Sequence, residues 1–346
     1  MWRRACHTSP RGLIVTDLYG AIDLGGTTVS CGLATASAEF AAETSFDTQA
    51  EQGPEAVLTR IAARLRELCE KVGATPRAIG MGIPGLVDAA RGITRFLPNL
   101  ATQWRDVHVA DFLSREFRCP VYLLNDARLA TLGELDYGAE AGTRNLVFLT
   151  IGTGIGGGVV IDGRLRLGPL GAAGEVGHQT VVADGPLCGC GNRGCLEAVA
   201  SGSALTREGV RLLGSGLAPH LAQLAGGEAS GVNPLRMAEA ARLGDAAVAQ
   251  AIERAAEYLG IGVANLVTIL HPEVVVLGGG VAGMGELLLG PVRRAILERV
   301  RMFPAGDVRV ECSTLGERAG LYGGIALAVA GGVTELAERG LARQPD

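Results

Sequence analysis

The fold is decided by two stretches of the same pattern, YGAIDLGGTTVSCGLA at residues 19–34 and NLVFLTIGTGIGGGVVID at residues 145–162. Each is typical of an apolar strand, a glycine-rich turn and a second apolar strand. Apolar residues recur with helical spacing at 54–72 and 246–270, and a β-branched run at 273–277 indicates a buried strand. The alternation of strands and helices predicts an α/β fold, and the repeated hairpin predicts a duplicated domain.

The composition is that of a soluble globular protein. The 346 residues suffice for two domains, and 48% hydrophobic against 19% charged residues argues against a disordered chain. A formal net charge of -5 gives no general attraction to nucleic acid or to anionic membranes. No long apolar run follows Arg3 and Arg4, so neither a signal peptide nor a transmembrane span is indicated. We therefore expect a cytoplasmic protein in which residues 1–14 form a loose leader.

A metal site is predicted in the segment 174–197, which holds three thiols, one imidazole and the carboxylates of Glu175 and Glu197. Thiolates at C-x-C-x4-C spacing can converge on one soft ion, and a histidine upstream supplies a fourth tetrahedral ligand. The predicted ligands of a structural Zn2+ are His178, Cys188, Cys190 and Cys195. Four protein ligands leave no position for water, so the metal would shape the segment and hold the glutamates toward a substrate.

Three glycine-rich turns follow predicted strands and can hold phosphates. In the first turn, Asp23 lies at the strand end and is followed by Gly25, Gly26, Thr27 and Thr28. Missing side chains let backbone amides approach a phosphate, the hydroxyls add donors, and the Asp23 carboxylate could hold a water on Mg2+. The alternative for this turn is an ordinary hairpin. The second turn spans residues 152–158 and the third residues 278–280. Because none of them contains a lysine, Mg2+ and backbone amides would bear the phosphate charge.

Glycine spacing alone also fits other nucleotide-binding proteins. The G-x-G-x-x-G of the second turn continues as a strand, whereas the dinucleotide-binding motif must open a helix. The same spacing at Gly278, Gly280 and Gly283 does lie between a strand and a helix, but no acidic residue ends the next strand about 20 residues on. A Walker loop needs a lysine before Ser or Thr, and Lys71 precedes Val72. A dehydrogenase is therefore disfavoured, and a Walker-type NTPase is excluded.

A candidate base follows the predicted strand 121–124. Asn125 and Asp126 lie where that strand gives way to a helix, a common position for active-site side chains in open α/β sheets. Asp126 could equally cap the helix. A carboxylate here could accept the proton of an alcohol whose oxygen attacks a γ-phosphoryl group. A polyhydroxyl ligand could be held by five side chains, if they converge: Asn99, Asp126, Glu175, His178 and Glu197.

Together these motifs resemble the ROK family of sugar kinases, and in particular its bacterial ATP-dependent glucokinases. The resemblance covers residues 19 to 330, nearly the whole chain. It is carried by DLGGT at 23–27, GIPG at 82–85, PN at 98–99, ND at 125–126, the turn at 152–158 and the metal segment.

The resemblance implies an actin-like, hexokinase-like ATPase fold, a ribonuclease H-like duplication with two α/β domains around a central cleft. A small N-terminal domain, 15–124, would be joined by a C-terminal helix at 317–346, and a large C-terminal domain, 125–316, would carry the zinc segment. Asp126 would be the base toward the 6-hydroxyl of glucose, with ATP as donor and Mg2+ positioned by Asp23. The remaining sugar ligands would be Asn99, Asn125, Glu175, His178 and Glu197. Nucleotide would be bound by Asp23, Gly25, Gly26, Thr27, Thr28, Thr153, Gly154, Gly278, Gly279 and Gly280.

One departure from the family pattern leaves the sugar open. After Asn99 and Leu100 many relatives continue with Pro-Gly-Trp, whereas this chain has ATQW at 101–104. N-acetylmannosamine, N-acetylglucosamine or fructose therefore remain alternatives to glucose. The family also includes sugar-sensing repressors, but about twenty residues precede Asp23, fewer than a helix-turn-helix domain needs. We expect a homo-oligomer, a dimer or a tetramer, that binds small molecules and neither nucleic acid nor membranes.

Overall fold

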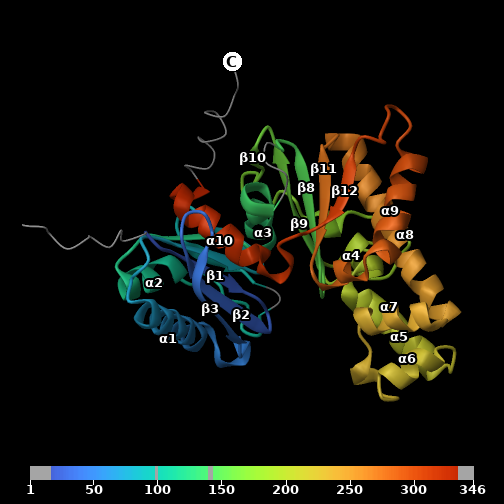
Figure 1. Ribbon diagram of the computed structural model, residues 1–346, viewed down its shortest axis with the longest axis horizontal. Helices are drawn as coiled ribbons and strands as arrows, with labels where there is room; N and C mark the ends of the chain where they lie inside the picture. Colours follow the sequence, from blue (N-terminus) through green and yellow to red (C-terminus); the bar gives the residue numbers. More distant parts are fainter. Residues whose placement is uncertain (1–16, 98–99, 139–142, 334–346) are drawn as a thin grey trace, which may run out of the picture.

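Two five-stranded sheets of the same topology form the frame of the molecule (Figure 1). The computed structural model describes residues 17–97, 100–138 and 143–333. The first sheet has the order β3-β2-β1-β4-β7 and the second the order β10-β9-β8-β11-β12. In each sheet three antiparallel strands from one meander are extended by two parallel strands. The predicted duplication is therefore confirmed at the level of strand order and direction.

The strand bounds follow the apolar runs of the sequence. The first sheet consists of β1 (Tyr19–Leu24), β2 (Thr28–Ala34), β3 (Phe40–Asp47), β4 (Ile79–Ile83) and β7 (Val121–Asn125). The second consists of β8 (Leu146–Ile151), β9 (Ile155–Ile161), β10 (Arg164–Leu165), β11 (Val274–Gly278) and β12 (Arg309–Cys312). A two-stranded ribbon, β5 (Leu86–Asp88) and β6 (Ile93–Phe96), lies beside the first sheet.

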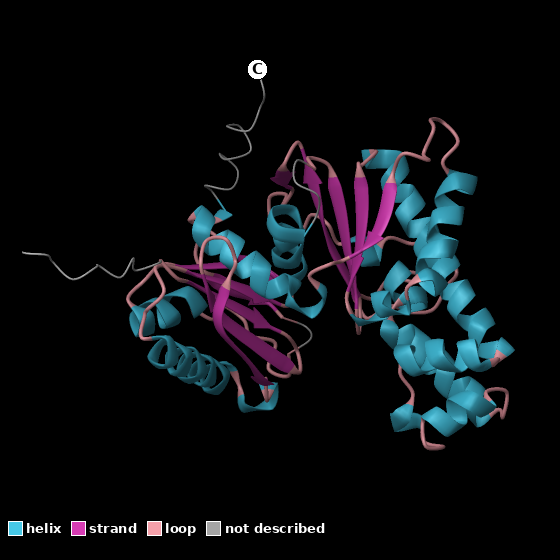
Figure 2. Ribbon diagram, in the orientation of Figure 1, coloured by secondary structure: helices cyan, strands magenta, loops and turns pink. Residues whose placement is uncertain are grey.

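Helices cover the outer faces of both sheets, and further helices lie between the sheets (Figure 2). On the first sheet, α1 (Pro54–Val72) and α2 (Val109–Phe117) share one apolar core with β1, β4 and β7. The core of the second sheet is completed by α4 (Leu196–Ala200), α5 (Gly202–Gly214), α6 (Pro219–Leu224), α7 (Pro234–Leu243), α8 (Ala246–Leu270) and α9 (Glu286–Arg299).

Helices α3 (Asp126–Gly133) and α10 (Ala319–Ala330) lie between the sheets (Figure 1). Where α3 and α10 cross, their backbones approach each other closely at two glycines. A Cβ on Gly133 would lie 2.8 Å from the Gly323 nitrogen, and a Cβ on Gly323 would collide with the Leu129 carbonyl oxygen. Because α3 follows β7 directly, its first residues are placed at the sheet edge that faces the second sheet.

The predicted helices at 54–72 and 246–270 have the bounds observed for α1 and α8. The predicted turn at 152–158 is wrong beyond Gly154, because β9 already begins at Ile155. The glycines of β9 serve close packing instead. A Cβ on Gly156 would lie 2.8 Å from the Ala127 Cβ, and one on Gly158 would collide with Thr131 of α3.

The C-terminal helix predicted at 317–346 also differs from the observed one. A single 3-10 turn occupies Gly316–Arg318, α10 begins at Ala319, and it ends at Ala330, before Gly331 at a φ of 81°. Residues 334–346 of that predicted helix lie outside the described residues. The domain boundaries at 15–124 and 125–316 stay a prediction.

Candidate active site

Two aspartates from different strands meet at one edge of the first sheet. Asp23 is near the end of β1, and Asp126 begins α3 directly after β7. Strand β4 lies between them, and its Gly82 carries no side chain that would separate the carboxylates. A Cβ built on Gly82 would lie 3.1 Å from Asp23 Oδ1 and 3.4 Å from the Asp126 Cα.

The helix-capping role that competed for Asp126 belongs to its neighbour. The Asn125 Oδ1 accepts hydrogen bonds from the backbone nitrogens of Ala127 at 3.1 Å and Arg128 at 3.2 Å, which makes Asn125 the N-cap of α3. Its Nδ2 donates to the Gly85 carbonyl at 3.1 Å. Asn125 is buried and engaged at both ends, so its predicted contact with a substrate stays a prediction.

Both aspartates have raised pKa values. Burial raises the pKa of Asp126 to about 6, against hydrogen bonding from the Ala127 N–H and the Arg128 charge, which lower it. Burial, and then the charge of Asp126, raise the pKa of Asp23 to about 7. A carboxylate that titrates near neutral pH is suited to accept a proton from an alcohol. A divalent cation beside Asp23 would favour its ionised form.

The first glycine turn presents hydroxyls to solvent. Its base is closed by the Gly25 N–H, which donates to the Thr28 carbonyl at 2.9 Å, and by the buried Thr48 hydroxyl, which donates to the Gly25 carbonyl at 2.8 Å. Gly26, Thr27 and Thr28 are exposed at the tip. The turn is a hairpin, which was the alternative to a phosphate-binding turn. The same geometry leaves its tip residues accessible to a phosphate.

The second and third glycine turns lie against each other. The second is the tip Gly152–Gly154, where Thr153 is exposed. In the third, Gly279 has a φ of 78°, and a Cβ on it would lie 2.6 Å from the Ile151 carbonyl oxygen, which precedes the second tip. Close backbone approach thus explains one glycine of the triplet, whereas no atom lies within 4 Å of a Cβ on Gly280.

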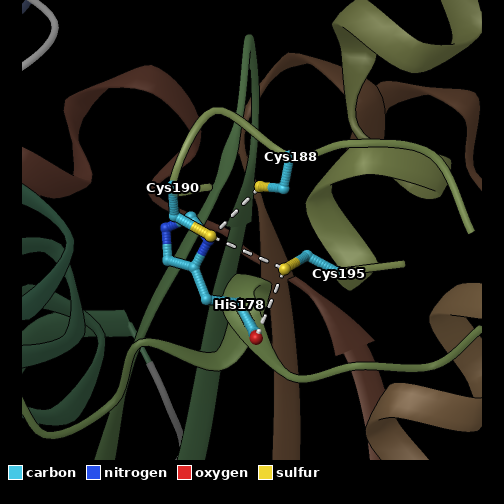
Figure 3. Close-up of side chains that lie close together, drawn as sticks. All are labelled: His178, Cys188, Cys190 and Cys195. Atoms are coloured by element: carbon cyan, nitrogen blue, oxygen red, sulfur yellow. Dashed lines mark hydrogen bonds between the residues drawn. The ribbon is translucent and has the colours of Figure 1, made fainter. Parts of the chain in front are cut away.

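The four predicted metal ligands come together in the structure (Figure 3). One ligand atom from each of His178, Cys188, Cys190 and Cys195 lies within 4.8 Å of all the others. The Sγ atoms of Cys190 and Cys195 are 3.7 Å apart, as are Cys188 Sγ and His178 Nδ1. Two thiolates on one tetrahedral zinc ion would be separated by about 3.8 Å. The donor set and its spacing therefore fit a closed tetrahedral site.

A tight loop brings the first two thiols into position. The Cys188 N–H donates to the Asn192 carbonyl at 2.8 Å, and the Gly191 N–H donates back to the Cys188 carbonyl at 3.0 Å. Cys195 then precedes α4, and His178 ends the 3-10 turn Val176–His178. Gly177 in this turn packs directly on β9, because a Cβ there would collide with the Ile155 carbonyl.

The flanking glutamates connect the metal segment to the rest of the site. Glu175 Oε2 lies 3.8 Å from His178 Nε2, whereas the other ring nitrogen, Nδ1, lies near Cys188 Sγ. Glu197 Oε2 accepts a hydrogen bond from the Ile155 N–H at 2.9 Å, and Cys188 Sγ lies 3.7 Å from Glu197 Oε1. Asn99, the remaining predicted sugar ligand, lies outside the described residues.

One residue of the site was not predicted. Arg128 of α3 is buried and binds Glu175 Oε1 through Nη2 at 2.8 Å. A signal existed in the sequence, since a cation two residues after a candidate base and on an otherwise apolar helix needs a buried acceptor. Its acceptors Ala172, Ala173 and Glu175 lie more than forty residues away, which sequence spacing does not reveal.

The duplicated sheets, the glycine tips on each of them and the carboxylates between them define the class of protein, one with the actin-like, hexokinase-like ATPase fold. The chain belongs to the ROK family, whose model matches residues 19–330. A glucokinase from Thermotoga maritima is 38% identical to this chain over 309 residues, which cover 88% of this chain and 95% of that protein.

Solved and regulatory relatives agree with this assignment. A ROK family glucokinase from Streptomyces griseus, solved in complex with glucose and AMPPNP, superposes with a TM-score of 0.79 at 34% identity and covers 90% of this chain and 99% of that one. The xylose repressor of Caldicellulosiruptor bescii is 35% identical over 263 residues, which is 75% of this chain and 65% of the repressor. Within the described residues, no helix combines the length and the apolar character needed to cross a membrane.

Proposed function

We propose that this protein is an ATP-dependent kinase that phosphorylates glucose at its 6-hydroxyl. The observation that carries the proposal is Asp126, a carboxylate with a pKa of about 6, placed between the first sheet and the β9 hairpin. The similarity to glucokinases, one of them solved with glucose and an ATP analogue, supports both substrates.

In the proposed reaction, Asp126 accepts the proton of the sugar hydroxyl as the hydroxyl oxygen forms a bond to the γ-phosphorus. The bond from the γ-phosphorus to the bridging oxygen breaks in line, and ADP leaves. Alignment and charge stabilisation supply the acceleration, with no covalent intermediate on the protein.

The nucleotide would lie across the glycine tips. Gly25, Gly26, Thr27 and Thr28 from the first sheet and Thr153 and Gly154 from the second would hold phosphates, and Gly278, Gly279 and Gly280 would border the adenosine. The Asp23 carboxylate would hold a water on Mg2+, whose charge would neutralise the phosphates. The exposure of the first tip and of Thr153 supports this assignment.

The sugar would lie against the metal segment. A structural Zn2+ on His178, Cys188, Cys190 and Cys195 would fix the backbone so that Glu175, His178 and Glu197 face the ring, together with Asn99 and Asn125. The thiolate-rich donor set favours zinc over a hard cation. A site with several carboxylates suits a neutral sugar and disfavours a sugar phosphate or sugar acid.

A panel of hexoses with ATP in a coupled assay tests the proposal. We expect the highest kcat/KM with glucose, and lower values with N-acetylmannosamine, N-acetylglucosamine and fructose. Turnover of another hexose without turnover of glucose would overturn the assignment of glucose, but the assignment as a sugar kinase would stand. No turnover of any sugar would overturn both.

A second candidate function, sugar-dependent repression, is favoured by one observation, the 35% identity to a xylose repressor. Specific operator binding in a gel shift, released by a sugar, would support it. We also propose that the protein is cytoplasmic and that it forms a homo-oligomer, a dimer or tetramer. Sedimentation of the purified protein would test the oligomeric state.

A further inference from the structure

Arg128 is the one cationic side chain that is fully buried among the residues that the structure describes. Burying a guanidinium costs free energy unless acceptors surround it. Arg128 has four such acceptors. Nη1 donates to Asn125 Oδ1 at 3.0 Å, Nε to the Ala173 carbonyl at 2.9 Å, and Nη2 to the Ala172 carbonyl at 3.1 Å and to Glu175 Oε1 at 2.8 Å.

These acceptors belong to two separate parts of the site. Asn125 is the N-cap of α3 and directly precedes Asp126. The other three acceptors lie around the start of the metal segment. Ala172 and Ala173 precede it, and Glu175 is within it. One planar group therefore spans from the residue before the proposed base to a proposed sugar ligand. The fixed fork of a guanidinium sets both the distance and the direction of its bonds.

Glu175 is left with one oxygen for other contacts. Its Oε1 is held by Arg128, whereas its side chain remains 48% exposed and its Oε2 points toward His178 at 3.8 Å. The exposed part of the Glu175 side chain remains accessible to a ligand. The ion pair with Arg128 restricts the rotation of this side chain, so that its remaining oxygen has a defined position.

We propose that Arg128 is a positioning residue that presents Glu175 to the sugar at a fixed distance from Asp126. This inference rests on the proposed function, because it assigns a role within the same site. Arg128 does not touch the sugar. It acts through Glu175, which it anchors to Asn125 at the start of α3.

The test compares Arg128→Lys with the wild-type protein in steady-state kinetics. Lysine retains the charge but carries its donors on one nitrogen, so it cannot reach both sets of acceptors. We expect the sugar KM to rise by about tenfold or more, with the ATP KM within about twofold of wild type. Arg211→Lys, in an exposed pair with Glu208 on α5, is the matched control and should change neither constant.

A double-mutant cycle separates positioning from a general loss of structure. Glu175→Ala should raise the sugar KM, and Arg128→Lys with Glu175→Ala together should equal Glu175→Ala within about twofold. Effects that multiply would show that the two residues act independently and would overturn the inference. So would an Arg128→Lys protein with a lowered Tm and an unchanged sugar KM.

Glu175→Asp provides the second arm if Arg128→Lys does not fold. It keeps the charge but withdraws the carboxylate by one methylene, so the bond to Arg128 and the presented oxygen cannot both be kept. A sugar KM raised by about tenfold at an unchanged ATP KM supports the inference, and wild-type kinetics overturn it. If the wild-type protein turns over no sugar, the proposed function itself is overturned. If the wild-type protein is active and Arg128→Lys has the same sugar KM, only the role of Arg128 is overturned.

Discussion

Glu197 Oε2 accepts a hydrogen bond from the backbone N–H of Ile155 at 2.9 Å, and this bond joins the metal segment to the second glycine tip. The carboxylate also occupies the space that a side chain at position 154 would need. Order in the metal segment is therefore transmitted to the loop assigned to ATP.

Removal of the metal should consequently affect both substrates. After chelation, we expect a lower Tm and a rise of about tenfold or more in the KM values for sugar and for ATP. Metal analysis and kinetics on the same samples measure this. Cys190→Ser should reproduce the effect, whereas Cys312→Ser, which lies outside the cluster, should not. Metal-free protein with both KM values unchanged would contradict the coupling.

Replacement of the base should separate chemistry from binding. Asp126→Asn keeps the size of the side chain but removes its ability to take a proton, so kcat should fall by about 10²–10⁴. Because the helix is capped by Asn125, the fold should be retained. Sugar binding measured by calorimetry without nucleotide should remain detectable. A variant with kcat within about tenfold of wild type would mean that the base is another group.

The pH dependence should report the same carboxylate. The pKa of Asp126 is raised to about 6, with Asp23, Glu175 and Arg128 as its charged neighbours. The active form is the ionised one, so kcat/KM should be constant at alkaline pH and fall about tenfold per pH unit below pH 6. The profile is measured with saturating Mg-ATP, which keeps Asp23 ionised. A fall in kcat/KM that begins only near pH 4 would mean that the pKa of the base is not raised by its surroundings.

Asp23 should contribute unfavourably to stability. Its folded-state pKa of about 7 is above the ordinary value of 3.8, so the folded protein binds more protons than the unfolded chain between those values. The unfavourable contribution is therefore complete above pH 7 and absent below pH 4. In protein free of nucleotide and Mg2+, Asp23→Asn should stabilise the fold at pH 8 by on the order of 2 kcal/mol.

The comparison needs thermal unfolding at pH 8 and at pH 4, with Asp184→Asn as an exposed control. The gain should be present at pH 8 and lost at pH 4, while turnover is abolished at both. Equal Tm values for Asp23→Asn and wild type at pH 8 would falsify the assignment of a raised pKa to Asp23.

Local patterns in the sequence were sufficient for much of this structure. The helical spacing of apolar residues predicted α1, and the spacing of the thiols predicted the cluster with His178, because both signals act within a few residues. Strand β3 was missed because it is an edge strand whose side chains are mostly exposed. Arg128 and the packing glycines of β9 were missed because their partners are remote in sequence.

The crossing of α3 and α10 has a mechanical consequence. Gly133 and Gly323 let the two helices approach backbone to backbone, and beside them Leu129 and Leu132 of α3 pack with Ala326 and Leu327 of α10. The distance between the two helices at this point is therefore set by backbone contact. A methyl group at position 133 or 323 would act as a wedge that forces α3 and α10 apart, so these two positions are where the spacing between the two sheets could be engineered.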